Sequence, residues 1–235
     1  TMKILPKLLS FLVTITLPFV LIMFSIRVLF TPLFLVVEYN MPGFPADPYG
    51  FSKEERLKWG SQSIQYLFNS DGPEFLENLR FEDGTSIYND REVSHMLDVK
   101  ILVKQALRWF YLILILYIMI IIWAKGKNQL HLLWDAASKG GWLTLGLIGA
   151  ILAAVVISFD ALFTAFHKVF FVGDTWLFYF SDTLIRLFPM RLWQDAFIFM
   201  GIITVVVALF FAIYGNKMKL KLLNSKENQS GFISR

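Results

Sequence analysis

Four long apolar stretches dominate the pattern of hydrophobic and polar positions along the chain. Each has the roughly 20 residues that a helix needs to cross about 30 Å of hydrocarbon. They predict four membrane-spanning helices, at 1–37, 106–124, 142–167 and 192–214. The first is bent at Pro32, and it is longer than the apolar part of a signal peptide, with no small-residue cleavage site after it. We therefore expect a permanent anchor.

The polar segments between the spans complete the layout: 38–105, 125–141, 168–191 and a tail at 215–235. Because the number of spans is even, both ends of the chain and 125–141 share one side, and the other two segments share the opposite side. Lysine and arginine outnumber aspartate and glutamate on the first side, whereas acidic residues are in excess on the second. The positive-inside rule then predicts a bacterial cell-membrane protein with both termini cytoplasmic.

Segment 38–105 carries two helix-start signals. Ser52 and Glu55 form an S-x-x-E capping box before an amphipathic stretch. Asn89 and Glu92 repeat this spacing before a helix that we expect to continue into the second span. The segment therefore predicts a helical cap outside the membrane.

Segment 168–191 is rich in aromatic residues, as are the interfacial belts of membrane proteins. Asp174 and Asp182 are candidate N-caps for two short helices lying in the interface. The predicted fold class is all-α and integral to the membrane: a four-helix transmembrane bundle with a helical extracytoplasmic cap and interfacial amphipathic helices.

Small residues mark one side of the third span, at Gly146, Gly149, Ala150, Ala153 and Ala154. Such residues let helix backbones approach closely in a membrane. They predict that the third span lies at the centre of the bundle.

Composition narrows the chemistry. The chain of 235 residues is 56% hydrophobic and 17% charged, against about 25% charged in a typical soluble domain. It contains no cysteine, which excludes thiol nucleophiles, disulfides, iron–sulfur clusters and cysteine-bound zinc. The net charge of +4 is not gathered on a soluble face, so we expect no nucleic-acid partner.

Only three histidines are present. His131 falls in segment 125–141, on the same side as the termini, and a lone loop histidine is usually solvated. His95 and His167 fall on the opposite side, just before the second span and at the end of the third. Because these spans are sequential and joined by a short loop, they should be antiparallel neighbours, and the two histidines should face each other at the membrane boundary.

Acidic residues accompany this pair. Asp98 lies at i+3 from His95, and Asp160 lies at i−7 from His167. A carboxylate inside a span is costly and suggests a functional site. Asp160 is equally suited to a structural ion pair with Arg27, which lies at a similar depth in the first span.

No motif for covalent catalysis is present. Ser94 would project away from the face of His95, and the chain lacks G-x-S-x-G, S-x-x-K and H-E-x-x-H. Two histidines without a nucleophile favour proton transfer, since imidazole titrates near neutrality. We therefore expect no cofactor and no metal.

Two other classes of function remain open. A metal-dependent membrane hydrolase would need a third ligand beside the histidines, such as Asp98 or Asp174. A transporter or scaffold without enzymatic activity is the other. A transporter should place polar groups near mid-membrane, but the third span has none between Thr144 and Ser158.

Two stretches carry a family resemblance: "EVSHMLDVK" at 92–100 and "FHKVFFVGDTWLF" at 166–178. Together with the four-span layout they resemble the bacterial lipoprotein intramolecular transacylase family. The resemblance implies an acyltransferase whose partners are diacylated lipoproteins of Gram-positive bacteria and membrane lipid. Such an enzyme moves the sn-2 acyl chain of the diacylglyceryl group to the α-amino group of the same N-terminal cysteine, giving a lyso-form lipoprotein.

The resemblance also implies roles for residues of this chain. His95 and His167 match the two motif histidines and would be catalytic, without an acyl-enzyme. We assign the base to His167 and the hydrogen-bond donor to His95, although nothing in the sequence distinguishes them. Phe170, Phe171 and Trp176 belong to the apolar wall that would contact the acyl chains.

Overall fold

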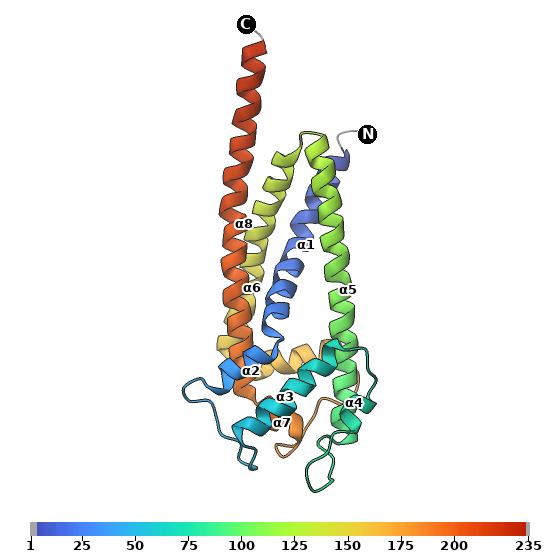
Figure 1. Ribbon diagram of the computed structural model, residues 1–235. Coiled ribbons are helices and arrows are strands. Elements are labelled where there is room, and N and C mark those ends of the chain that lie inside the picture. Colours follow the sequence, from blue (N-terminus) through green and yellow to red (C-terminus); the bar gives the residue numbers. More distant parts are fainter. Residues whose placement is uncertain (1–3, 234–235) are drawn as a thin grey trace. The chain divides into compact units, whose positions relative to one another are not determined.

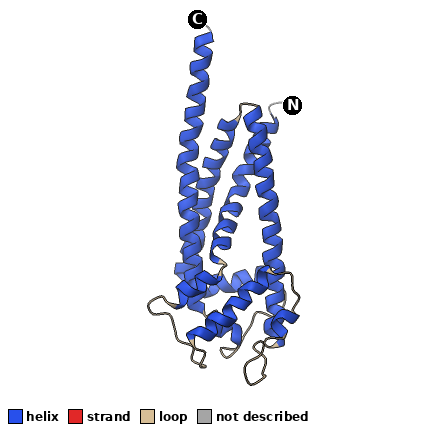
Figure 2. Ribbon diagram, viewed as in Figure 1, coloured by secondary structure: helices blue, strands red, loops and turns tan. Residues whose placement is uncertain are grey.

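Helices make up the regular structure of the chain. The computed structural model describes residues 4–233, and Figure 2 shows helices joined by loops throughout that range. As labelled in Figure 1, they are α1 (Ile4–Leu29), α2 (Pro32–Tyr39), α3 (Lys53–Phe68), α4 (Glu74–Glu77), α5 (Asp90–Gly126), α6 (Leu130–Phe170), α7 (Thr183–Leu187) and α8 (Met190–Ile233). Within those residues, the one strand-like pairing is an isolated bridge between Arg80 and Ser86. The prediction of an all-α protein is confirmed.

Four of these helices, α1, α5, α6 and α8, are long and apolar enough to cross a membrane. Large apolar side chains such as Ile122 and Ile213 stand exposed along them. A helix satisfies its own backbone hydrogen bonds, so such a surface suits hydrocarbon. The predicted four-span integral membrane fold is confirmed.

The ends of the first and fourth spans differ from the sequence predictions. The bend predicted at Pro32 is a true break, because α1 ends at Leu29 and Pro32 begins α2 in the first helical position. The polar tail predicted at 215–235 continues α8 as far as Ile233. This segment contains no proline and is rich in lysine and leucine, which favour helix.

The chain divides into two compact units. Unit 1 contains Thr1–Ser25, Arg108–Ala153 and Met200–Arg235, and unit 2 contains Ile26–Leu107 and Ala154–Phe199. Unit 1 is made of parts of the four long helices, which run side by side (Figure 1). Unit 2 gathers the short helices α2, α3, α4 and α7 with the beginning of α5.

Glycines allow the close helix contacts of unit 1, but they are not the small residues predicted from the sequence. A methyl group at Gly141 would lie 2.7 Å from the carbonyl oxygen of Ala208, so the backbones of α6 and α8 touch there. A methyl group at Gly146 or Gly149 would meet nothing within 4 Å. The prediction that these residues place the third span at the centre is therefore wrong: the close approach occurs earlier in α6.

Unit 2 has the compact core expected of a helical cap. Tyr66, Leu76, Ile87 and Leu187 are almost wholly buried in one apolar cluster. The predicted capping box begins α3, with the Ser52 side chain accepting from the Glu55 amide and Glu55 accepting from the Ser52 amide.

The helix α6 is broken near its end. Ser158 has extended rather than helical backbone angles, φ −163° and ψ 93°, and its hydroxyl accepts a hydrogen bond from the amide of Ala161 at 3.4 Å. The hydroxyl thus caps a new helical segment, 159–170. The third span, predicted as one helix over 142–167, therefore places His167 on a separate segment within unit 2.

Candidate active site

His95 lies in the second turn of α5, at the heart of unit 2. The helix begins with the predicted cap: the Glu92 amide donates to the Asn89 side chain, and the Asn89 amide donates to Glu92. The other Glu92 oxygen accepts from the backbone amide of Leu184 at 2.6 Å, which ties α7 to α5. Glu92 therefore fixes the turn that carries His95, and the His95 side chain is 8% exposed.

His167 is buried near the end of α6, in the segment after the break at Ser158. Its Nδ1 lies 2.7 Å from the carbonyl oxygen of Phe163. A carbonyl oxygen can only accept, so Nδ1 carries the proton and donates it. In neutral His167 the lone pair is therefore on Nε2.

The two histidines meet. Their ring centroids are 5.9 Å apart and the ring planes are inclined by only 23°. The structure thus brings together the two histidines that the sequence predicted to be neighbours. The third histidine, His131, lies near the start of α6 in unit 1 and is 3.3 Å from the Lys226 ammonium.

Aromatic rings enclose the pair. Phe171 and Phe178 pack edge-on against His95, with centroids 5.0 and 5.3 Å away. Phe163 and Trp176 lie 4.2 and 5.0 Å from the ring of His167. The Nδ1 of His95 has no hydrogen-bond partner. Packing rather than hydrogen bonding therefore holds His95 in place.

The three aromatic residues assigned to acyl-chain contact have different positions. Phe171 is buried against His95, and Trp176 covers His167 while its indole N–H donates to the Gly173 carbonyl at 3.1 Å. Phe170 is half exposed and packs at a tilt against Phe166, with ring centroids 4.7 Å apart. The first two line the histidine cage, and only Phe170 offers an open apolar face.

Polar contacts hold the aromatic segment against α5. The Thr175 hydroxyl donates to Asp98 at 3.3 Å, so Asp98 anchors this segment. Asp182 forms an ion pair with Arg91 at 3.0 Å and accepts from the amide of Tyr179 at 2.9 Å. The sequence predicted Asp182 only as an N-cap. It does precede α7, but its side chain makes no cap bond there.

The remaining predicted residues lie apart from the histidines. Asp174 and Asp160 are exposed, and Asp174 begins a turn rather than a helix, with its carbonyl accepting from the Leu177 amide. The Arg27 guanidinium lies over the ring of Phe68, 4.8 Å from its centroid. The alternative of an Arg27–Asp160 ion pair is therefore wrong: the aromatic face takes the cation instead.

A buried carboxylate cluster was missed. Glu38, at the end of α2, is fully buried and its oxygens face no donor. Burial, together with the neighbouring Asp195, raises the pKa of Glu38 to about 7. Asp195 is itself paired with Arg191. A proton on Glu38 would let it donate to Asp195. In the sequence, the position of Glu38 directly after the apolar stretch that ends at Val37 could have indicated a buried carboxylate.

The possible ligands for a metal ion can be examined among the described residues. No group of three histidine, cysteine, aspartate or glutamate side chains able to hold a metal ion occurs among residues 4–233. Asp98, proposed as a third ligand, is engaged by Thr175, and Asp174 is exposed. The donor set beside the histidines therefore does not fit a zinc hydrolase, which uses three protein ligands.

Known proteins match this chain over most of its length. The family model described as "Lipoprotein intramolecular transacylase Lit" matches residues 11–193. A protein of Aquifex aeolicus (strain VF5), described as uncharacterized, is 33% identical over 218 residues, covering 90% of this chain and 96% of that protein.

Solved structures match as well. The membrane-integral lipoprotein intramolecular transacylase Lit from Bacillus cereus superposes with a TM-score of 0.76 at 20% identity, covering 96% of this chain and 99% of that one. A structure of the same protein with a histidine replaced by arginine gives a TM-score of 0.72 at 18% identity, covering 97% and 96%. Taken together, the family match, the four apolar helices and the shared fold show that the chain belongs to the lipoprotein intramolecular transacylase family, and is thus a multi-pass membrane acyltransferase.

Proposed function

We propose that this enzyme moves the sn-2 acyl chain of a diacylglyceryl-modified lipoprotein to the α-amino group of the same lipoprotein's N-terminal cysteine. The amine nitrogen bonds to the ester carbonyl carbon, and the bond from that carbon to the glyceryl oxygen breaks. The proton lost by nitrogen ends on the glyceryl oxygen. The product is a lyso-form lipoprotein of unchanged mass.

The observation that carries this proposal is the hydrogen bond from His167 to the Phe163 carbonyl. It fixes the proton on Nδ1 and leaves the Nε2 lone pair to accept a proton from the attacking amine. Since the acceptor is a backbone carbonyl of the same helical segment, the orientation of the ring does not depend on another side chain. His167 is the base in this proposal.

His95 is the donor. Its ring is close to that of His167, and its buried Nδ1 has no hydrogen-bond acceptor, which favours the proton on Nε2. A neutral imidazole has one N–H, which can donate to the ester carbonyl oxygen as negative charge develops there. Because the ring centroids are 5.9 Å apart, one substrate could contact both histidines, with its amine at His167 and its carbonyl at His95.

The reaction needs no acyl-enzyme intermediate. Ser94 is exposed, away from the buried face of His95, and the chain has no cysteine. Because amine and ester belong to one molecule, holding them in contact supplies much of the rate through effective concentration.

An apolar surface next to the dyad suits the acyl chains. Val169, Phe170 and Val172 are exposed, immediately after His167 in the chain. Exposed apolar groups of this kind mark a binding or membrane surface. We assign the acyl-chain contact to this surface, with Phe171 and Trp176 keeping water from the histidines.

The sidedness follows from the lysines. Lys125, Lys127, Lys217 and Lys221 lie at the ends of the spans on the side of the chain termini. By the positive-inside rule we place the termini in the cytoplasm and the dyad at the extracytoplasmic face. The partners are then diacylated lipoproteins and membrane lipid, with no nucleic acid.

A product assay tests the proposal. Purified protein in lipid vesicles is incubated with a synthetic diacylated lipopeptide, and the products are fragmented in a mass spectrometer. The expected product has unchanged mass and an acylated amino group. His95→Ala and His167→Ala should each abolish it, whereas His131→Ala, a matched histidine outside the site, should not.

The other outcomes distinguish the alternatives. Release of free fatty acid that stops on adding a chelator would identify a metal-dependent hydrolase. A folded protein that leaves the lipopeptide unchanged would contradict an enzymatic role on this substrate. Equal loss in His131→Ala and His167→Ala would contradict the assignment of the dyad.

A further inference from the structure

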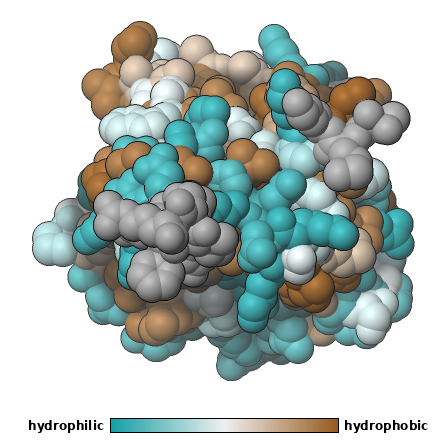
Figure 3. Space-filling model, turned by 90° about the horizontal axis from the view of Figure 1, so that it is seen from above, coloured by the Kyte–Doolittle hydropathy of each residue, from teal (hydrophilic) through white to brown (hydrophobic). Residues whose placement is uncertain are grey.

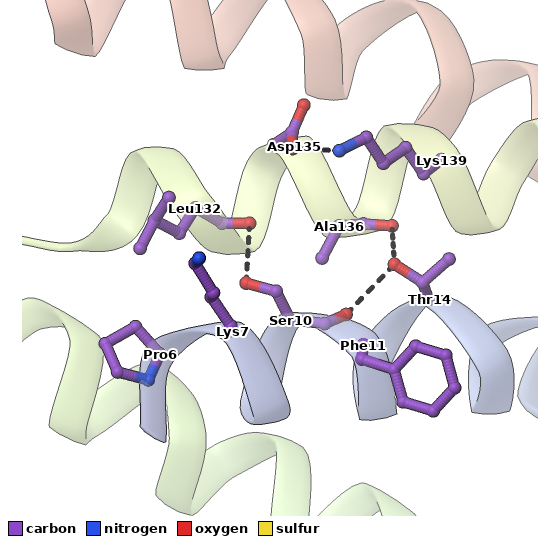
Figure 4. Close-up of a pocket in the computed structure, with 9 residues that line it drawn as sticks. All are labelled: Pro6, Lys7, Ser10, Phe11, Thr14, Leu132, Asp135, Ala136 and Lys139. Carbon is purple, nitrogen blue, oxygen red and sulfur yellow. Dashed lines mark hydrogen bonds and ion pairs between the residues drawn. The ribbon is translucent and has the colours of Figure 1, made fainter. Parts of the chain in front are cut away.

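A cleft of about 370 Å³ opens in unit 1, between the beginning of α1 and the beginning of α6 (Figure 4). Its lining includes Pro6, Lys7 and Ser10 from α1, and Leu132, Asp135 and Lys139 from α6. All of these residues belong to unit 1, whereas His95 and His167 lie in unit 2. The transfer reaction therefore gives the cleft no role.

The charged groups around the cleft are mostly positive. Asp135 accepts from Lys139 at 2.7 Å and from Lys219 at 2.8 Å, so one carboxylate is shared by two ammonium groups. Lys7 is exposed, and it reaches from α1 toward α6 (Figure 4). Lys139 and Lys219 thus share one carboxylate, and Lys7 adds a further positive charge from α1. Figure 3, which looks onto this end of unit 1, shows hydrophilic side chains gathered there.

Helix ends add to the positive field. Helices α1 and α6 both begin beside the cleft, at Ile4 and Leu130, and neither has an acidic residue in its first turn. The helix dipole gives a first turn partial positive charge, which favours an anion, even though Pro6 has no N–H and the Leu132 amide donates to the Gln129 carbonyl. Lysines and two helix starts therefore act together on a negatively charged ligand.

A stripe of exposed apolar side chains on α1 reaches the cleft. Ile4, Leu8 and Phe11 are exposed at i, i+4 and i+7 on α1, so they share one face of the helix. Phe11 is also part of the cleft lining. Lys7 stands beside this stripe, where a lysine at the end of a span reaches the level of lipid phosphates.

The hydroxyls of the cleft are already engaged. Ser10 donates to the Leu132 carbonyl at 3.5 Å, and Thr14 lies 2.9 Å from the Ser10 carbonyl and 3.2 Å from the Ala136 carbonyl. They join α1 to α6. Recognition of a ligand is thus left to the ammonium groups and the apolar stripe.

We propose that this cleft binds a phospholipid with a net negative headgroup, its phosphate between Lys7 and Lys139 and one acyl chain along Ile4, Leu8 and Phe11. The combination of positive charge with an exposed apolar stripe fits a lipid and not a free anion. A lysine near an anionic lipid surface contributes about 1 kcal/mol, which corresponds to about fivefold in affinity.

Native mass spectrometry tests the proposal. The full-length protein is freed of lipid in an uncharged detergent and titrated with phosphatidylglycerol or with phosphatidylcholine of the same acyl chains. Phosphatidylglycerol should bind more tightly, and Lys7→Gln and Lys139→Gln should each weaken it about fivefold. Lys217→Gln removes the same charge from an exposed position on α8 outside the cleft and should leave the affinity unchanged.

Three results would overturn it. They are equal affinity for the two lipids, equal loss in Lys7→Gln and Lys217→Gln, and full competition by soluble glycerol phosphate, which would show a site for a free anion. Lys7→Arg keeps the charge and should keep the binding, so its weakening to the level of Lys7→Gln would also contradict the proposal. Size-exclusion profiles confirm that each variant is folded.

Discussion

Two buried sets of titratable side chains within unit 2 are organised in opposite ways. Asp47 and Arg186 form a two-point ion pair, with the shortest contact 2.8 Å, and Asp47 also accepts from the Phe51 amide at 2.7 Å. His95 and His167 share a single hydrogen bond to the protein, from His167 to Phe163. The first set is saturated with partners, and the second has capacity left for a substrate.

The pKa of Asp47 shows what saturation does. Burial would raise this pKa, but the hydrogen bonds from Arg186 outweigh burial and hold it below its usual range. The carboxylate is thus fixed in its charged form, and it joins the loop after α2 to α7. Buried polar groups whose hydrogen bonds are all made to the protein stabilise the fold. Buried groups that lack hydrogen-bond partners, such as His95, are candidates for catalysis.

The largest effect should come from the unsaturated set. His167→Ala removes the base and should lower the rate of acyl transfer by about 10²–10⁴-fold, the range that general acid–base groups supply. The variant also loses one hydrogen bond and the packing of a buried ring, so it should unfold at a lower temperature than the wild type but remain folded at the temperature of the assay. Transfer rate and thermal unfolding, measured on the same preparation, separate the two effects. A variant that is inactive only because it is unfolded would contradict this prediction.

The saturated set should respond in the opposite sense. Asp47→Ala leaves a mostly buried guanidinium without its partner and should lower the free energy of unfolding by about 3–5 kcal/mol. Thermal unfolding in detergent measures the change, with the exposed Glu82→Ala as control. An unfolding temperature equal to that of the wild type would show that the pair is not structural.

Glu38 lies between these extremes, since it is buried but lacks a donor. Its pKa of about 7 in the fold is above the ordinary value of 4.5. Between these values the folded state binds more protons than the unfolded state, so this contribution to stability is present below pH 4.5 and lost as pH rises through 7. The loss should be on the order of 1–3 kcal/mol.

Comparing wild type with Glu38→Gln isolates this contribution from other titrating groups. The variant cannot ionise at this position, so the difference in unfolding free energy between the two proteins should change between pH 4.5 and 7. A constant difference across that range would show that Glu38 is ionised in the fold at all these pH values.

The smallest effect should come from the polar anchor of the aromatic segment. Thr175→Val removes the hydrogen bond to Asp98, and an ordinary hydrogen bond contributes about 0.5–1 kcal/mol. We expect a two- to fivefold lower transfer rate, because Trp176 next to it covers His167 less often. Thr85→Val, which alters another threonine–aspartate hydrogen bond in an exposed turn, is the matched control and should leave the rate unchanged.

Hydrophobic patterning predicted the four spans, because their length and their scarcity of charged residues leave few other folds. The capping motifs predicted the starts of α3 and α5, since both ends of each cap are local in sequence. Topology alone placed His95 and His167 on one side. The motif resemblance then marked them as a pair.

The features that the sequence did not predict, the break in α6 and the partners of several charged side chains, depend on contacts between distant segments. The break in α6 occurs at Ser158 and not at a proline or glycine, so the local sequence did not predict this break. Arg27 contacts the aromatic ring of Phe68. The sequence alone does not tell whether a distant aromatic ring or a distant carboxylate will meet this guanidinium. Likewise, the pairing of Asp182 with Arg91 and of Asp47 with Arg186 required the packed cap.

The most direct test of the central claim follows the acyl chain itself. A diacylated lipopeptide with deuterium only in the sn-2 chain is incubated with the enzyme, and fragment masses locate the label. The account predicts labelled acyl on the α-amino group at unchanged total mass, with none formed by His167→Ala. Label released as free fatty acid, an amide carrying the unlabelled chain, or full activity of His167→Ala would contradict it.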